Sequence, residues 1–146
     1  MDIVIRVVKT KADFSSAMKV REIVFIDEQQ IDQSIESDGY DLSATHVIAE
    51  SFGQTVGTGR IIKSADDGIN TARLGRMAVL ETFRRRGIAS LILRALEFEA
   101  KKQGFKNITI HSQSYTKSLY SKEGYLEKGK PFYEAGIEHV TMVKDL

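Results

Sequence analysis

Residues 80–104, LETFRRRGIASLILRALEFEAKKQG, place three consecutive arginines directly before a helical pattern. An apolar stripe recurs at helical spacing and is formed by Ile88, Leu91, Ile92, Ala95 and Leu96. Gly104 follows as the predicted C-terminal cap. The N-terminus of a helix carries partial positive charge and unpaired N–H groups, so it attracts anions and disfavours cations. The arginines are therefore unexpected at this end of the helix.

A bound phosphate group would explain the position of the arginines. Gly87 and Ala89 leave backbone N–H groups accessible at the helix start, where they can point at a phosphate oxygen. Arginine also binds phosphate in a bidentate fashion. The alternative is a solvated run of charges whose side chains point away from the protein. The loop is neither a Walker loop nor a dinucleotide fingerprint, because the glycine patterns of those motifs are missing.

The segments on either side of this helix predict a parallel crossover. Residues 71–79, TARLGRMAV, form a predicted strand in which Gly75 marks a bulge. Residues 107–112, NITIHS, form a second predicted strand after the helix. A strand, a helix and a strand in this order favour parallel pairing of the two strands.

The remaining segments add strands and helices around this unit. A strand is predicted over residues 3–8, a helix over 11–24, and a loop or short helix over 27–40. Residues 47–50 and 55–63 form a predicted hairpin around 51–54. A short helix over 115–122, a segment over 125–130, a break at Pro131 and a last strand from His139 complete the chain. This order predicts an α/β (α+β) sandwich in one domain, residues 1–146, with a mixed sheet and helices on its faces.

The composition is that of an ordinary globular protein. The 146 residues are 42% apolar and include 21 basic and 20 acidic side chains, which leaves a net charge of +1. This balance draws the protein neither to nucleic acid nor to a membrane surface. The absence of cysteine excludes disulfides, thiolate metal sites and a cysteine nucleophile. No segment resembles a signal peptide or a membrane span, so a cytoplasmic location is expected.

Two motifs resemble those of a known family. Arg84-x-x-Gly87-x-Ala89 is similar to the [R/Q]-x-x-G-x-[G/A] loop of the GCN5-related N-acetyltransferase (GNAT) family, where the loop also follows a strand and opens a long helix. LYSKEGY, residues 119–125, resembles the later F-Y-x-x-x-G-[F/Y] segment of that family. VFIDEQQI, ATHVIAE, GRMAV and FYEAGIEHVTM resemble a subgroup of small bacterial acetyltransferases. The resemblance covers nearly the whole chain and implies a mostly antiparallel sheet whose central strands splay apart around an acyl-CoA.

The resemblance implies acetyl-CoA as the acyl donor and indicates which residues bind it. Its pyrophosphate would lie on the backbone amides of the loop formed by Arg84, Arg85, Arg86, Gly87, Ile88 and Ala89. Its pantetheine arm would pair with the main chain of Met77, Ala78 and Val79, and the Val79 N–H would polarise the thioester carbonyl. The alternative for these three residues is an ordinary core strand. Many family members carry an asparagine after the next strand, and Ser112, Gln113 or Ser114 stands in its place here.

Acyl transfer to an amine requires two proton transfers. Tyr120 matches the tyrosine that often protonates the departing thiolate in this family, and a packed aromatic residue is the alternative. The group that takes a proton from the amine stays open among Glu28, Asp38, Asp41, His46, His111 and His139, or a chain of water molecules. Glu28, His46 and His139 are the first candidates among them.

The favoured function is direct N-acetylation of an amine on a small molecule or peptide, without a metal. Three alternatives stay open: a non-catalytic acyl-CoA-binding or regulatory module, a nucleic-acid contact at the arginines, and acyl-homoserine-lactone synthesis. The near-zero net charge disfavours the nucleic-acid contact. The loops over residues 27–40 and 131–138 would form the acceptor site. The acidic residues of the first loop indicate either a cationic acceptor or a solvated face. A homodimer stays open as an alternative to a monomer.

Overall fold

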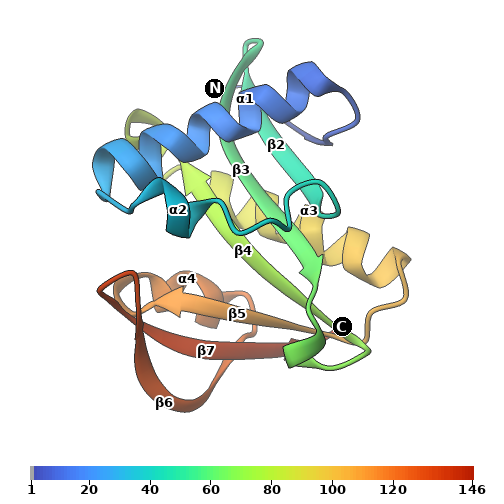
Figure 1. The fold of residues 1–146 in the computed structure, drawn as a ribbon. Coiled ribbons are helices and arrows are strands. Elements are labelled where there is room, and N and C mark those ends of the chain that lie inside the picture. Colours follow the sequence, from blue (N-terminus) through green and yellow to red (C-terminus); the bar gives the residue numbers. More distant parts are fainter. Residues whose placement is uncertain (1) are drawn as a thin grey trace.

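The computed structural model describes residues 2–146, whose strands form one mixed sheet with helices on both faces (Figure 1). The strands are β1 (Ile3–Val7), β2 (Thr45–Ser51), β3 (Gln54–Lys63), β4 (Thr71–Val79), β5 (Asn107–Gln113), β6 (Leu126–Glu134) and β7 (Ile137–Asp145). The α-helices are α1 (Lys11–Arg21), α2 (Gln33–Glu36), α3 (Ile88–Lys102) and α4 (Lys117–Lys122). A π-helical segment, η1 (Glu22–Glu28), and the 3₁₀ turns η2 (Ala65–Asp67), η3 (Glu81–Phe83) and η4 (Ser114–Thr116) complete the elements.

The order of strands across the sheet is β1-β2-β3-β4-β5-β7-β6. β4 and β5 are parallel, and every other neighbouring pair of described strands is antiparallel. α3 links β4 to β5, which confirms the predicted crossover and the mixed, mostly antiparallel sheet.

The two central strands separate halfway along their length. Their pairing begins at Thr71 with Asn107 and ends at Leu74 with Ile110. β4 continues to Val79 and β5 to Gln113, and the two strands diverge beyond the last pair (Figure 1). The splayed central strands that the family resemblance implied are therefore confirmed.

α3 packs closely against the sheet through small residues on β3. Ile92, Leu93 and Leu96 are fully buried between helix and sheet, whereas Leu91, which the sequence pattern placed in the apolar stripe, is exposed. A Cβ atom at Gly59 would lie 2.6 Å from Met77 Sδ and within 2.9 Å of the Leu96 side chain. Glycine at this position therefore allows the close approach of α3, which fixes the helix start beside the end of β4.

Glycines bound α3 at both ends. Gly87 precedes the helix with φ 79°, and Gly104 follows it with φ 94°. The Gly104 N–H donates to the Lys101 carbonyl at 3.1 Å, and the Phe105 N–H donates to the Ala100 carbonyl at 3.0 Å. This pair of hydrogen bonds is a Schellman motif, so the predicted cap at Gly104 is confirmed.

The first helix extends beyond its predicted end at Val24. α1 gives way to the wider π-helical turns of η1, in which the Gln29 N–H donates to the Val24 carbonyl at 3.0 Å. The following segment, predicted as a loop or short helix, contains the four-residue α2. Asp32 caps α2 by accepting a hydrogen bond from the Ser34 N–H at 2.9 Å.

The break predicted at Pro131 is wrong. β6 runs through Pro131 with a register shift between Lys128 and Phe132, because β6 is an edge strand and the missing N–H has no partner to lose there. Ala135 and Gly136 then form a tight turn with φ values of 51° and 73°, and β7 begins at Ile137 rather than at the predicted His139.

The bulge in β4 lies one residue beyond the predicted glycine. Gly75 pairs with Arg60 and Ala78 pairs with Thr58, so β4 carries the extra residue between these two pairs. Arg76 adopts a left-handed conformation there, with φ 52°.

None of the described helices is both long and apolar enough to cross a membrane.

Candidate active site

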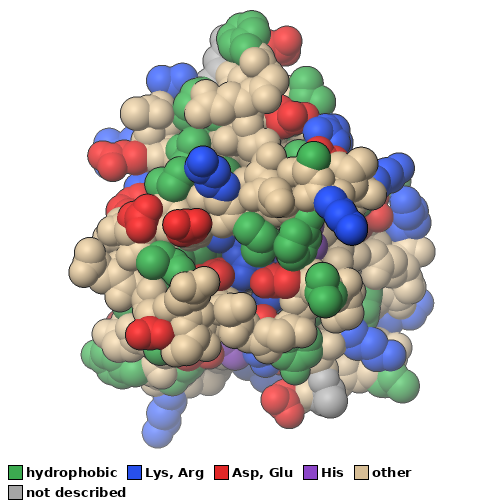
Figure 2. All heavy atoms as spheres, turned by 45° about the horizontal axis from the view of Figure 1, so that its top comes forward, with side chains coloured by type: hydrophobic (Ala, Val, Ile, Leu, Met, Phe, Trp, Pro, Cys, Tyr) green, Lys and Arg blue, Asp and Glu red, His purple; other side chains and the backbone are tan. Residues whose placement is uncertain are grey.

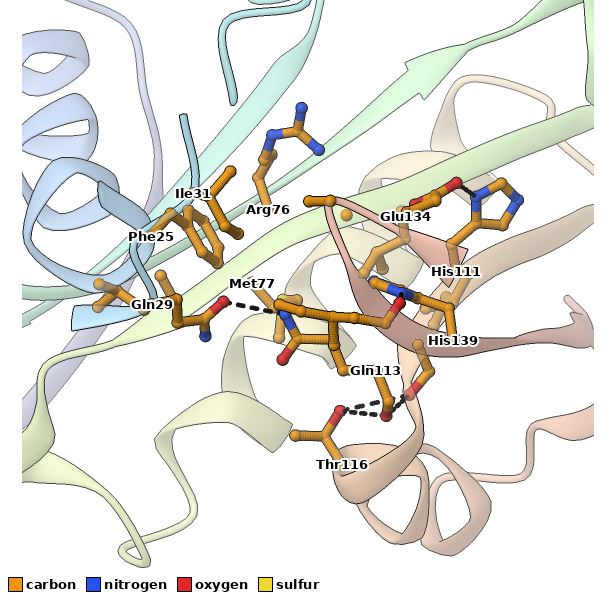
Figure 3. A pocket seen from close by; sticks show the side chains of 18 of the residues that line it. Phe25, Gln29, Ile31, Arg76, Met77, His111, Gln113, Thr116, Glu134 and His139 are labelled. Carbon is orange, nitrogen blue, oxygen red and sulfur yellow. Dashed lines mark hydrogen bonds and ion pairs between the residues drawn. The ribbon is translucent and has the colours of Figure 1, made fainter. Parts of the chain in front are cut away.

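A cavity of about 680 Å³ lies where β4 and β5 separate (Figure 3). Its lining comes from η1, α2, the second half of β4, β5, α4 and the β6–β7 hairpin. In the view of Figure 2, hydrophobic, acidic and basic side chains lie together around a hollow of the surface. The separation of two parallel strands therefore produces a concave site suited to a ligand.

The backbone of Val79 faces the gap between the strands. Val79 lies opposite Gly57, and the adjacent Leu80 N–H donates to the Val56 carbonyl at 2.9 Å. In an antiparallel ladder this pattern makes Val79 and Gly57 a non-hydrogen-bonded pair, so the Val79 N–H and carbonyl point away from β3. Arg84 Nε donates a hydrogen bond to the Val79 carbonyl at 2.8 Å. The Val79 N–H can therefore donate to a ligand in the gap.

Arg84 turns toward the cavity and pairs with Glu28. Its two terminal nitrogens donate to the two Glu28 carboxylate oxygens at 2.6 Å each. Hydrogen bonding from Arg84 lowers the pKa of Glu28. Glu28 lines the cavity, but it is held as an ion-pair partner of Arg84, which weakens it as a base.

The loop before α3 presents backbone N–H groups at the cavity edge. Arg85 and Gly87 both have positive φ, 62° and 79°, and no side chain of the described residues caps the helix. Alternation of such conformations directs successive N–H groups to one side and forms an anion-binding concavity. Ala89 lines the cavity, and the Arg86 guanidinium lies 5.5 Å from the centre of the Phe83 ring. The Ile88 side chain is buried in the core.

Tyr120 projects from α4 into the cavity lining. The residue is buried, and burial raises the pKa of its hydroxyl above the ordinary value. Its ring packs edge-on against Tyr125 at 6.0 Å between centres. Tyr120 therefore stays protonated at neutral pH and is available as a proton donor.

The two histidines chosen from the sequence occupy different places. His139 lines the cavity and stacks on Phe132, and its Nδ1 lies 2.7 Å from the Ile137 carbonyl oxygen. His46 is buried outside the cavity lining, with Nε2 2.8 Å from the Asp41 carbonyl, and burial lowers its pKa. The fold does not bring His46 to the cavity.

Of the three residues that stand in place of the family asparagine, two line the cavity and one does not. Ser112 and Gln113 line the cavity, whereas Ser114 does not, although its hydroxyl is buried without a partner among the described residues. Gln113 Nε2 donates to Gln29 Oε1 at 2.9 Å, which joins β5 to the end of η1 (Figure 3). The Ser112 hydroxyl donates to the Gln113 carbonyl at 3.0 Å.

An ion-pair network that the sequence did not indicate borders the cavity at its α2 end. Its members are Arg21, Arg60, Arg76, Glu36, Asp38 and Asp41. Burial is the largest single influence on Asp38 and would raise its pKa. The hydrogen bonds from Arg60 and from the Tyr40 N–H, together with the charges of Arg60 and Arg76, outweigh burial and lower the pKa to about 2. The pKa of Asp41 is also lowered, because Arg21 and Arg60 outweigh its burial. Both carboxylates are thus poor bases at neutral pH.

Two further cavity residues form a pair across strands β5 and β6. His111 Nδ1 lies 2.8 Å from Glu134 Oε1 (Figure 3), and this contact lowers the pKa of Glu134. Glu134 lies within the FYEAGIEHVTM motif, but no local pattern connects it to His111, 23 residues earlier. Within residues 2–146, no group of three or more His, Asp or Glu side chains has an arrangement that could hold a metal ion.

Comparison with known proteins identifies the family. Residues 12–146 match the acetyltransferase (GNAT) domain. The uncharacterised protein YyaT of Bacillus subtilis is 34% identical over 145 residues, which cover 97% of this chain and 95% of that protein. The chain therefore belongs to the GNAT acetyltransferase family.

Solved structures share the same fold. An acyl-CoA N-acyltransferase from Pseudomonas aeruginosa matches with a TM-score of 0.84 and 21% identity, over 98% of this chain and 99% of that one. A GNAT family acetyltransferase from Elizabethkingia anophelis with acetyl-CoA bound matches with a TM-score of 0.68 and 19% identity, over 99% and 98%.

Proposed function

We propose that this protein transfers an acetyl group from acetyl-CoA to an amine of a small molecule or protein, by direct attack in a ternary complex. The observation that carries the proposal is the cavity between β4 and β5, with the Val79 N–H directed into the gap beside the uncapped start of α3. A strand edge and a helix N-terminus at one site suit a ligand that joins an amide-containing arm to a diphosphate. Acetyl-CoA is such a ligand, and it is bound in the Elizabethkingia relative.

The residues of the donor site divide into two groups. The diphosphate would accept hydrogen bonds from backbone N–H groups of the 84–89 loop, with Arg85 and Arg86 adding positive charge. The pantetheine arm would lie along Met77, Ala78 and Val79, with Ser112 and Gln113 on the opposite wall. We place the reaction in the cytoplasm, as expected from the sequence.

Each end of the thioester has a group suited to its chemistry. The Val79 N–H would stabilise the oxyanion that forms when the amine attacks the carbonyl. Tyr120 would protonate the thiolate as the carbon–sulfur bond breaks. Burial raises the pKa of Tyr120. A thiol that leaves in the same buried surroundings would have a raised pKa for the same reason. Because both pKa values would rise, the pKa difference that opposes proton transfer from Tyr120 to the thiolate would be smaller than if only Tyr120 were buried.

The proposal is tested by two measurements on the full chain. Calorimetry with acetyl-CoA should detect binding, and acetyl-CoA with a panel of amines should release free thiol at a rate that depends on the amine. Absence of acetyl-CoA binding would falsify the proposal. Binding without thiol release for any amine would instead support a regulatory acyl-CoA-binding module.

A further inference from the structure

The contact between His111 and Glu134 fixes the tautomer of the imidazole. Glu134 has a lowered pKa and is ionised at neutral pH, so its oxygens accept hydrogen bonds and do not donate them. His111 Nδ1, 2.8 Å away, must therefore carry the proton of this contact. When the ring is neutral, the free electron pair lies on Nε2, as a general base requires.

Glu134 distinguishes His111 from the neighbouring His139. The Ile137 carbonyl also makes His139 Nδ1 the protonated nitrogen, because a carbonyl oxygen only accepts. His111 Nδ1, in contrast, lies against the ionised carboxylate of Glu134 rather than a neutral carbonyl. Glu134 and Phe132 from β6 contact His111 directly. The charges of His139 from β7 and Arg73 from β4 also act on Glu134, and the Arg73 guanidinium is held by Asp67 at 2.9 Å.

Part of the wall opposite this pair is apolar, although Gln29 and Arg76 lie beside it. Phe25 and Ile31 face His111 and Glu134 across the cavity (Figure 3), and Ile35 extends this wall with a side chain that is half-exposed. An acceptor molecule could cover these side chains with an apolar body while its nitrogen lies on the histidine side.

The carboxylates near the apolar wall are already paired. Glu28 is bound by Arg84, and Glu36 and Asp38 by the arginines of the network. Their negative charge is therefore compensated, and a polyamine or lysine-rich peptide would have to displace an arginine to use it. An acceptor with several cationic groups, bound through the carboxylates of the acidic loop, is therefore not favoured by these contacts.

We propose that the acceptor is a primary amine on an apolar body, and that His111, positioned by Glu134, takes the proton from its nitrogen. This inference rests on the proposed acetyl transfer. The apolar body would lie against Phe25, Ile31 and Ile35, and the nitrogen would lie near His111 Nε2.

The proton transfers balance over the whole reaction. One proton passes from the ammonium group to His111 Nε2, and the free amine attacks the thioester carbon. A carbon–nitrogen bond forms, the intermediate collapses and the carbon–sulfur bond breaks. The thiolate takes a proton from Tyr120, and the proton lost by the new amide nitrogen restores the Tyr120 hydroxyl through solvent. His111 then returns its proton to solvent.

The test compares two amines of nearly the same shape. 2-Phenylethylamine is an ammonium ion at neutral pH, whereas O-benzylhydroxylamine is already neutral and needs no base to become nucleophilic. His111→Asn keeps a donor for Glu134 but removes the base, and we expect kcat with 2-phenylethylamine to fall about 100-fold. The rate with O-benzylhydroxylamine should change little. Glu134→Gln should show the same selective loss, while Glu127→Gln, an exposed β6 glutamate outside the cavity, is the matched control.

Each outcome decides the inference. If wild-type protein fails to bind acetyl-CoA, the proposed function itself is wrong. If it binds acetyl-CoA but acetylates spermidine or a lysine peptide in preference to 2-phenylethylamine, or acetylates none of them, the acceptor class is wrong. Equal losses with both probe amines in His111→Asn and Glu134→Gln would give the pair a purely structural role. A selective loss in His139→Asn instead would assign the proton transfer to His139. If His111→Asn does not fold, the rates of Glu134→Gln with the two probe amines still test the proton transfer. The amine preference of the wild-type protein still tests the acceptor class.

Discussion

Tyr120 is the residue at which burial and chemistry are most closely linked. Tyr120 lines the cavity, while its ring packs against Tyr125. Burial disfavours the tyrosinate and keeps the proton on the oxygen. The same side chain can therefore stabilise the core and donate a proton.

Removing the Tyr120 hydroxyl separates these two roles. Tyr120→Phe keeps the ring and its packing, so we expect acetyl-CoA affinity by calorimetry to stay unchanged while kcat for thiol release falls about 100-fold. Tyr125→Phe is the matched control, because it removes a hydroxyl that donates to Glu97 at 2.8 Å outside the cavity. Unchanged turnover in Tyr120→Phe would remove this residue from the proton-transfer scheme.

At the scale of elements, ion pairs hold α2 beside the cavity. α2 is too short to be stable by itself, and Arg21 from α1 and Arg76 from β4 both pair with its Glu36. The position of the apolar side chain Ile35 therefore depends on charges supplied by distant elements.

Because of this network, the free energy of unfolding should depend on pH in the acidic range. The pKa of Asp38 is lowered from 3.8 to about 2, so its contribution is complete above the unfolded value and is lost as pH falls from about 4 to about 2. We expect Asp38→Asn to reduce the free energy of unfolding by about 1 kcal/mol at pH 6, with solvent screening of this partly exposed group allowed for. Urea titrations from pH 6 to pH 2 should show the difference shrinking toward zero. Asp27→Asn, outside the network, should show no such trend, and a constant difference for Asp38→Asn would contradict the assignment.

A second prediction at this scale concerns the packing of α3 on β3. Gly59→Ala places a methyl group against Met77 and Leu96, so we expect a loss of about 1–3 kcal/mol in the free energy of unfolding. Gly75→Ala on the neighbouring strand is the control, because nothing lies within 4 Å of its added methyl group. Equal stabilities of the two variants in urea would show that α3 shifts freely away from β3.

At the scale of the whole molecule, the sheet consists of two parts joined along half of one strand pair. β1 to β4 form one part and β5 to β7 the other, and the parts meet only over Thr71–Leu74 and Asn107–Ile110. A ligand seated between the separated halves would contact both parts and tie them together.

Acetyl-CoA should therefore stabilise the entire protein. At a concentration of about 100 times Kd, binding adds about 2.7 kcal/mol to the free energy of unfolding, and we expect Tm to rise by about 8 °C. Hydrogen exchange should slow in β5 as well as in β4 when the ligand is present. A rise in Tm without added protection of β5 would mean that the ligand binds elsewhere.

The strand–loop–helix unit over residues 71–104 follows from the amino-acid sequence alone, since strand alternation, helical periodicity and glycine at positive φ are local properties. The sequence also indicated the 84–89 loop and Tyr120, because these belong to continuous motifs. The contacts between side chains that line the cavity between β5, β6 and α2 arise only when the chain is folded. His111 and Glu134, or Arg76 and Glu36, lie far apart in the chain, and their pairing depends on sheet register and on the divergence of β4 and β5. The same long-range geometry removed His46 from the cavity, because its strand, β2, lies beyond β3 and β4 from the gap.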